Sequence, residues 1–424
     1  MRAPTVIFSL LTVSLAASPE TASPVWTTAF RAETRLIHDT NVFLQDEAPL
    51  VAGQSQRGEP VRAEATELIA AASASLRRKP ADDTGLNADF GYSFEWHRFD
   101  AFRAESHRDH RLAASLHESA RAWLSDAKLS VLEVDGSSVA PVYNEQGGVP
   151  AIGGEPVRAR YAQTIFNASG STLWHPVGAW RFRGQFTALN QDFHTQHDAT
   201  IVGCANYVDR GQAVTGLDAG RVLWGDLTVW TSLRAGRQWQ ANLLGRTDNF
   251  TNTLLRPLVG LEGTLAPKLR VTAWAGPDYH RFTGERRAGT DAVRVLPYFE
   301  TSAIWSPTAA DNLSLGAREQ LWLGSSGRSA YREFRGDAAW THRLSKALDT
   351  SLRFGAQHGN FAGFAATPRN DSIFSTAVAV GEQLTRTVRL DASLTREWSQ
   401  SRIAATTGRA YERWLGSVGV ARTW

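Results

Sequence analysis

The chain has 424 residues, with 45 Lys and Arg against 42 Asp and Glu, and a formal net charge of +3 at pH 7. So small a charge argues against a nucleic-acid-binding protein, which would normally carry a basic patch or stripe. The 35 Gly and 15 Trp beside a single Met are uncommon in a helical protein of this size. The lone Cys204 excludes an internal disulfide.

The N-terminal residues have the layout of a secretory signal peptide. Met1-Arg2 forms a short positive end, residues 3–17 are mostly apolar, and small residues around Ala16 offer a cleavage site. We expect a signal peptide over 1–17, a short periplasmic leader over 18–25 and one domain over 26–424. No other segment approaches the roughly 18 consecutive apolar residues of a membrane helix. A membrane protein of this sequence must therefore be a closed β-barrel, because lipid offers no partner to open backbone groups.

The segment Leu86–Arg98 alternates between apolar and polar residues with almost no error. Successive side chains of a strand point to opposite faces, so this strand has one apolar, aromatic face and one charged face. The alternation continues for about a dozen residues, close to the roughly 9–11 tilted residues that cross a bilayer. A strand of a soluble sandwich usually alternates for only five or six.

Similar segments follow one another along the chain. The first is Trp26–Leu44, and the Ala-rich segment Glu64–Arg78 is helical by propensity but alternates, so we predict a strand. Arg111–Leu132 holds one long strand or two short ones, and Asp135–Pro156 is the longest expected loop. The remaining expected strands are Val157–Phe166, Trp180–Asn190, Thr200–Val208, Ala213–Val222, Leu227–Trp239, Leu254–Leu265, Leu269–His280, Val293–Trp305, Leu313–Leu323, Tyr331–His342, Leu348–His358, Ile373–Leu384, Val388–Trp398 and Tyr411–Trp424.

The connections between these strands alternate in length. Residues 266–268, 345–346 and 385–387 are tight turns, whereas residues 240–253, 283–291, 359–372 and 399–408 are longer and polar. This asymmetry is typical of outer-membrane barrels, which have short periplasmic turns and longer extracellular loops. The sequence thus predicts an all-β fold: a single antiparallel transmembrane β-barrel of 16–18 strands in the cell outer membrane. The strand number is even if both termini are periplasmic.

The last strand places Trp424, Val420, Val418 and Trp414 on one face. It resembles the C-terminal targeting strand of bacterial outer-membrane proteins, which ends on an aromatic residue preceded by hydrophobic residues at alternate positions. Arg422 departs from that pattern, although at the membrane edge it can reach the headgroups. We take Trp424, Val420 and Val418 as the candidate assembly signal, which implies the barrel-assembly machinery as a partner.

The segment Asp39-Thr40-Asn41-Val42-Phe43 closes the first expected strand. It resembles a short motif at the same place in β-barrel porin-like outer-membrane proteins of Gram-negative bacteria. Some of these are encoded with exopolysaccharide export systems. The resemblance implies an outer-membrane channel and does not name a substrate.

The sequence contains no convincing enzyme constellation. His107, His110 and His117 lie near Asp109 and Glu118, but their spacing puts His110 on the opposite face of a strand from the other two. We interpret them as solvated loop and lumen histidines and expect no catalytic residue, metal ligand or cofactor.

The predicted inner wall is rich in charge. Only four of the 45 basic residues are Lys, and Arg provides fork-shaped donors suited to carboxylate and phosphate. Because Arg158 and Arg160, like Arg181 and Arg183, share a face, we expect a modest anion preference, offset in part by nearby carboxylates. The candidate pore-lining residues are Asn87, Asp89, Glu95, Arg158, Arg160, Arg181, Arg183, Arg389 and Asp391.

These observations predict a passive channel for small polar or anionic solutes, or the outer-membrane conduit of a polysaccharide export system. The alternatives are an outer-membrane lipid-modifying enzyme and a secreted all-β carbohydrate-binding protein. Expected partners are outer-membrane lipids and lipopolysaccharide, and no nucleic acid. The solute and the oligomeric state stay open.

Overall fold

The structure is a computed structural model of the whole chain. It describes residues 25–42, 44, 63–80, 85–136, 162–176, 178–194, 209–241, 249–283, 291–324, 330–364, 369–403, 406–407 and 411–424. The expected signal peptide, residues 18–24 of the leader, residues 137–156 of the longest loop, the strand expected at Thr200–Val208 and residues Arg158, Arg160 and Cys204 lie outside these ranges.

The described chain is almost entirely β-strand, with one short 3-10 helix, η1 (Arg103–Glu105). No helix among the described residues is long and apolar enough to cross a membrane. The strands are β1 (Val25–Asp39), β2 (Ala65–Lys79), β3 (Gly85–Phe99), β4 (His107–Ala120), β5 (Trp123–Asp135), β6 (Gln163–Trp174), β7 (Trp180–Phe193), β8 (Arg210–Trp224), β9 (Leu227–Gln240), β10 (Asn252–Ala266), β11 (Leu269–Phe282), β12 (Val293–Trp305), β13 (Asp311–Leu323), β14 (Ala330–Arg343), β15 (Leu348–Asn360), β16 (Arg369–Gln383), β17 (Val388–Ile403), β18 (Thr406–Thr407) and β19 (Tyr411–Thr423).

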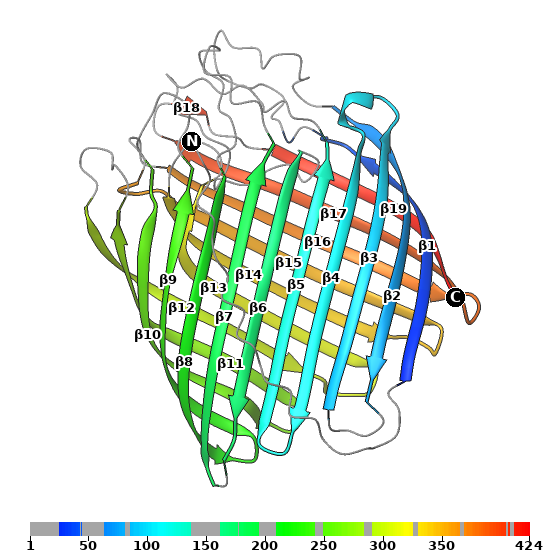
Figure 1. Ribbon diagram of the computed structural model, residues 1–424. Coiled ribbons are helices and arrows are strands. Elements are labelled where there is room, and N and C mark those ends of the chain that lie inside the picture. Colours follow the sequence, from blue (N-terminus) through cyan, green and yellow to red (C-terminus); the bar gives the residue numbers. More distant parts are fainter. Residues whose placement is uncertain are drawn as a thin grey trace.

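The strands form one closed antiparallel barrel. Each long strand pairs with its neighbours in sequence, and β1 pairs with both β2 and β19, so the sheet has no free edge. Figure 1 shows the first and last strands side by side on the right of the barrel. The seam continues to the end of the chain, where the Trp424 amide donates to the Phe30 carbonyl at 2.9 Å. The two-residue β18 pairs only with the end of β17, so 18 strands make the wall, at the upper limit of the predicted range.

The two rims of the barrel differ as the sequence predicts. Connections of two to five residues join β2 to β3, β4 to β5 and each later pair in that alternation, and the opposite rim carries the longer ones. With an even number of strands in the wall, β1 begins and β19 ends on the rim of the short turns. One of these turns is fixed by Asp226, whose carboxylate accepts hydrogen bonds from the Thr264 amide (2.9 Å) and hydroxyl (3.2 Å). These bonds hold the pKa of Asp226 below its usual range.

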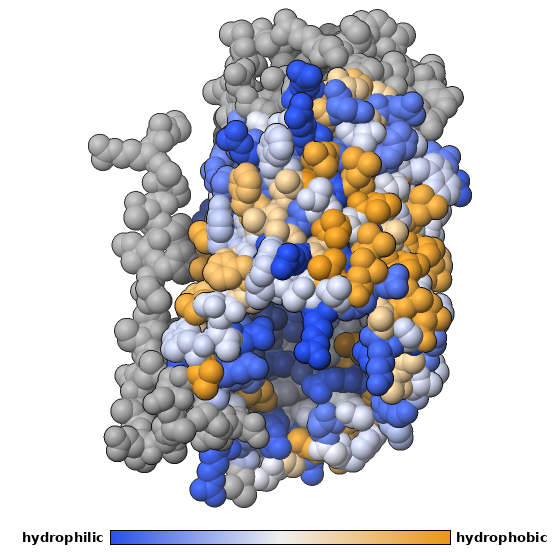
Figure 2. Space-filling model, turned by 90° about the vertical axis from the view of Figure 1, so that its right-hand side faces the viewer, coloured by the Kyte–Doolittle hydropathy of each residue, from blue (hydrophilic) through white to orange (hydrophobic). Residues whose placement is uncertain are grey.

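The outer face of the wall is apolar. On β3 the aromatic side chains of Phe90, Tyr92 and Trp96 are exposed, and the same alternation leaves Leu217 of β8 and Leu315 of β13 exposed. In Figure 2 apolar side chains gather over this face, above a hollow lined by hydrophilic residues. Such an exterior suits the hydrocarbon of a bilayer. The outer face of a secreted soluble barrel would instead contact water and be mostly polar.

The limits of several elements differ from those expected. The strand expected at Val157–Phe166 is β6, which begins at Gln163 and continues to Trp174. The first strand ends at Asp39, where its carboxylate accepts a hydrogen bond from the Asn41 amide at 2.9 Å and makes a turn. The segment expected at Arg111–Leu132 is two full strands, β4 and β5, which pair from Ala120↔Trp123 onward. β4 begins at His107, so the histidines expected partly in a loop belong to a strand.

Candidate functional site

One hairpin leaves the wall and bends into the barrel. β12 pairs with β13 only between Phe299↔Glu319 and Trp305↔Leu313. Beyond Glu319, β13 continues to Leu323 paired with β14 alone. We call residues 320–324 and 330–332, the loop-side end of this hairpin, the inward hairpin end.

The inward hairpin end lies against the inner face of β8 and β9. Three strands of the wall, β10, β11 and β12, separate β9 from β13. Hydrogen bonds to its backbone carbonyls come from side chains of that face. Arg210 Nη1 donates to Leu323 (2.6 Å), Gln238 Nε2 to Leu321 (3.1 Å) and Gln240 Nε2 to Gly324 (2.5 Å). The Arg210 guanidinium also lies 5.3 Å from the ring of Trp322. These contacts hold the segment across the lumen.

Apolar packing fixes the same segment from the loop side. Phe250, Phe282 and Phe364 meet edge to face, with ring centroids 5.9–6.1 Å apart, a favourable geometry for aromatic rings. They form one buried cluster with Leu321, Leu323 and Ala330 of the inward hairpin end. In a single-layer wall an outward side chain is exposed, whereas Leu321 and Ala330 are fully buried. The lumen is therefore narrowed at its loop end.

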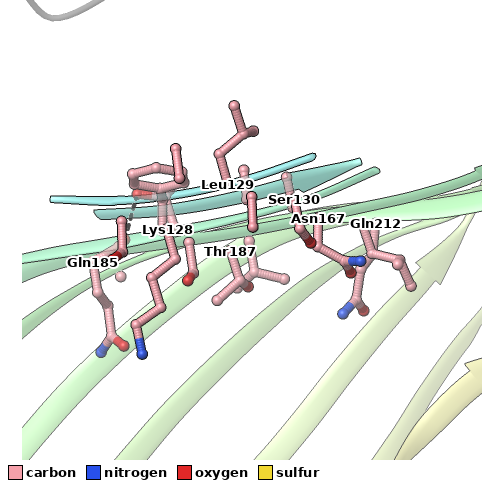
Figure 3. Close-up of a pocket in the computed structure, with 18 of the residues that line it drawn as sticks. Lys128, Leu129, Ser130, Asn167, Gln185, Thr187 and Gln212 are labelled. Atoms are coloured by element: carbon pink, nitrogen blue, oxygen red, sulfur yellow. Dashed lines mark hydrogen bonds between the residues drawn. The ribbon is translucent and has the colours of Figure 1, made fainter. Parts of the chain in front are cut away.

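A cavity of about 990 Å³ lies inside the barrel, lined by residues of strands from β2 to β13. In Figure 3 Lys128, Gln185 and Gln212 point into it, while Leu129 points away to the outer face. The charged residues that line it are five basic and two acidic: Arg77, Lys128, Arg234, Arg256, Arg318, Asp89 and Glu300. Basic side chains thus outnumber acidic ones among the residues that line the cavity.

Part of the wall carries buried charges that compensate one another. Arg256 Nε lies 2.8 Å from Asp278 Oδ1, and Asp278 Oδ2 lies 2.8 Å from His280 Nε2. The side chains of Asp278 and His280 are fully buried. The guanidinium of Arg256 also stacks 4.5 Å from the Tyr298 ring, so Arg256 reaches the cavity in a fixed orientation.

Comparison with known proteins finds no matching family model and no matching curated protein. Solved structures of similar shape include the outer membrane protein opdK from Pseudomonas aeruginosa (11% identity, 94% of this chain and 99% of that chain, TM-score 0.41). Others are OccK2 (OpdF) from the same organism in complex with glucuronate (12%, 94% and 98%, 0.44) and an anion-selective porin from Comamonas acidovorans (9%, 95% and 100%, 0.42).

The closed 18-strand wall with its apolar exterior is the architecture of an outer-membrane β-barrel. The predicted fold class is confirmed by the strand pairing of this chain itself.

The candidate pore-lining residues within the described ranges lie on the inward parity of their strands, and all but Asn87 alternate with an exposed apolar neighbour. Several of them are engaged in ion pairs. Arg183 binds Asp218 and Glu262, each at 2.8 Å, and its guanidinium lies over Trp230 and Trp274. Asp89 pairs with Arg77. Their part in conduction stays a prediction.

Two further candidates form a cluster near the short turns. Arg389 donates to both carboxylate oxygens of Asp349 at 2.9 Å and to Asp391 at 2.8 Å. Arg181 instead donates to the carbonyls of Gly178 and Trp180. Of the four arginines expected to line neighbouring strands, only Arg181 and Arg183 are described. Arg183 is held by two carboxylates, whereas Arg181 is held by backbone carbonyls.

The sequence reasoning missed most of the cavity. Arg234, Arg256 and Arg318 belong to strands whose alternation is clear, but nothing local distinguishes them from other inward arginines. The proposed assembly residues Val418, Val420 and Trp424 are exposed on the outer face, and the Arg422 guanidinium lies 5.0 Å from the Trp424 ring.

Proposed function

We propose that this barrel is a passive outer-membrane channel for small anionic solutes. The observation that carries the proposal is the excess of basic side chains around the cavity below the inward hairpin end. Pore width and lining charge decide which solutes pass through a channel of this kind.

The cavity offers donors that suit a carboxylate or phosphate. Lys128 reaches it from β5, and no ion pair to Lys128 occurs within the described part of the chain. Arg234 and Arg318 contribute guanidinium forks, each in a long ion pair, at 3.9 Å to Glu300 and 3.7 Å to Glu333. Amides of Asn167 and Gln212 add neutral donors and acceptors.

The narrowed lumen favours small solutes over a polymer. A polysaccharide conduit needs a continuous wide bore, whereas the inward hairpin end is hydrogen-bonded across the barrel. We therefore place polysaccharide export second. Outer-membrane lipids and lipopolysaccharide are the proposed partners of the apolar exterior, and the assembly machinery that of the last strand.

Planar-bilayer recordings test the proposal. The purified protein should conduct, and its reversal potential in a KCl gradient should show anion preference. Lys128→Gln combined with Arg318→Gln should reduce that preference, whereas Lys346→Gln, in a turn at the rim, should leave it unchanged. The preference should weaken at about 1 M salt, where the screening length falls to roughly 3 Å.

Absence of conductance would exclude the channel. Cation preference that the double variant leaves unchanged would show that the cavity is not the selectivity surface.

A further inference from the structure

Five ionisable side chains gather inside the barrel near the loop rim, away from the cavity described above. Glu67 comes from β2, Glu95 and His97 from β3, and His107 and Asp109 from β4. The strand register places them side by side, because His97 is directly opposite His107 and Glu95 is opposite Asp109. All five lie on the inward parity of their strands, next to the exposed outward residues Trp96 and Leu112.

Each of the two histidines has an acceptor beside its Nδ1. His107 Nδ1 lies 2.9 Å from the Glu105 carbonyl, which can only accept, so Nδ1 carries the proton. His97 Nδ1 lies 2.6 Å from Glu67 Oε1, a carboxylate that likewise favours a proton on Nδ1. In both rings Nε2 is therefore the nitrogen on the side of Asp109, and on His97, which also has Glu95 3.5 Å from Nε2, a metal would replace the Nε2 proton. Metal-binding histidines are usually oriented in this way, by a carboxylate or a backbone carbonyl at the other ring nitrogen.

The two Nε2 atoms approach the same carboxylate. His97 Nε2 lies 3.9 Å from Asp109 Oδ2, and His107 Nε2 lies 3.8 Å from Asp109 Oδ1. Glu95 Oε2 lies 3.5 Å from His97 Nε2. The rings themselves are stacked, with centroids 4.1 Å apart and an angle of 11° between their planes.

Two atoms at the centre of this group lack hydrogen-bond partners within the described residues. They are His97 Nε2 and Asp109 Oδ1, both buried. His97 is 9% exposed and His107 7%. Their nearest charged neighbours are Glu95, 3.5 Å from His97 Nε2, and His107 Nε2, 3.8 Å from Asp109 Oδ1, which are longer than good hydrogen bonds. An ion between these groups would satisfy both atoms.

We propose that His97, His107 and Asp109 bind a divalent first-row transition metal such as Zn²⁺ through Nε2, Nε2 and the carboxylate. Glu95 is placed to supply a fourth donor, and Glu67 positions His97. Donors at about 2.0–2.2 Å from a tetrahedral Zn²⁺ are roughly 3.3 Å apart, and the observed spacings between histidine and carboxylate atoms are 3.5–3.9 Å. Because the two rings are stacked, one imidazole must rotate out of the stack on binding so that both Nε2 atoms face the same ion. Imidazole together with carboxylate suits Zn²⁺, Cu²⁺ and Ni²⁺ better than Ca²⁺ or Mg²⁺.

The surroundings hold the ligands in place. Asp100 accepts hydrogen bonds from the amides of Thr66 (2.9 Å) and Ala101 (2.6 Å), which ties the β3–β4 connection to β2. The Thr66 bond above all holds the pKa of Asp100 below its usual range. The Phe99 amide donates to Ser106 Oγ at 3.1 Å. A bound metal would join β3 and β4 at this rim, with Glu67 of β2 holding His97, a role separate from the proposed conduction.

Metal titration of the untagged, folded barrel in detergent tests the site. After dialysis against a chelator and its removal, Zn²⁺ added in a calorimeter should bind with one ion per chain. His97→Gln, His107→Gln and Asp109→Asn should each lower the affinity at least about tenfold, as expected when a ligand or its orienting partner is lost. Co²⁺ should give the visible absorption of a nitrogen- and oxygen-bound ion.

His117→Gln is the matched control. His117 also lies on β4 and pairs with a carboxylate, Asp126, at 2.8 Å, but it has no second histidine opposite. Its variant should bind Zn²⁺ as the native chain does. Each variant is first checked for the heat-dependent gel shift of a folded barrel. Only variants that pass this check are titrated, so a loss of Zn²⁺ binding reports on the ligand and not on misfolding. Failure of the native barrel to bind Zn²⁺, or equal binding by a folded ligand variant, would overturn the proposal.

Discussion

Among individual residues, glycines of the inner wall make room for tryptophans on the neighbouring strand. Gly220 is opposite Trp230, and Gly260 lies between Trp230 and Trp274 in the register of β9, β10 and β11. A Cβ at Gly260 would overlap the six-membered ring of Trp274. The Trp230 indole therefore packs against Gly220, and the Trp274 indole packs against Gly260. The guanidinium of Arg183 lies over both indole rings.

Replacing Gly260 by Ala should destabilise the barrel by about 1–3 kcal/mol, the usual cost of an added methyl in a well-packed interior. The measurement is urea unfolding in detergent or lipid, followed by tryptophan fluorescence. Gly416→Ala serves as the control, because nothing lies within 4 Å of its added Cβ. Equal unfolding free energies for the two variants would show that the Trp274 ring is free to move aside.

At this scale the sequence predicts the face of a residue better than its partners. The alternation around Phe182 correctly puts Arg183 on the inner face. Its carboxylate partners Asp218 and Glu262 are 35 and 79 residues away, so no local pattern identifies them. His97 was missed as a neighbour of His107 for the same reason, since only the pairing register brings them together.

Among the elements, the inward hairpin end differs most from the pattern of the others. Successive side chains of β13 still point to opposite faces in this segment. One face contacts side chains of the inner wall and the other contacts the cluster of Phe250, Phe282 and Phe364, so neither face contacts lipid. Three hydrogen bonds from Arg210, Gln238 and Gln240 hold it, and each contributes about 0.5–1.5 kcal/mol.

Replacing Arg210 and Gln238 together by Ala should loosen this segment and increase single-channel conductance, with more frequent current fluctuations. The control is Gln383→Ala, whose amide donates to the Thr385 carbonyl on the opposite rim. Bilayer recordings of the two variants provide the comparison. A conductance equal to that of the native chain would mean that the inward hairpin end does not limit flow.

The sequence predicts nearly every strand that the structure describes, because lipid on one side and water on the other impose a period of two. It does not reveal that β13 turns inward. The direction of that bend depends on hydrogen-bond partners on β8 and β9, which are distant in sequence and follow the ordinary alternation themselves. The packing of Phe250, Phe282 and Phe364 likewise comes from three separate connections or strand ends.

For the whole molecule, closure depends on the seam between β1 and β19. The register runs from Arg31↔Thr423 to Asp39↔Leu415, and two backbone hydrogen bonds join Phe30 and Trp424. The alternation of short and long connections predicts this closure, since an even number of strands returns the chain to its starting rim.

Deleting Trp424 removes the bonds to Phe30 and the exposed aromatic end of the last strand. We expect a marked fall in membrane insertion and in the fraction that resists SDS without heating, because a barrel with a frayed seam has an edge at which unfolding begins. Trp305→Ala is the control, since Trp305 is similarly exposed at the same rim but lies away from the seam. If the deletion variant inserts and migrates like the native chain, neither Trp424 nor the end of the seam guides assembly.

The seam also sets the order of folding. Every other pairing in the wall joins strands that follow one another in the chain, so it closes only a short loop. The pairing of β1 with β19 joins the two extremes of the barrel sequence and has by far the greatest contact order, which makes it the slow step. Until it forms, the molecule is an open sheet with two unpaired edges, and the lifetime of that sheet determines how long the protein can aggregate or accept a strand from another chain.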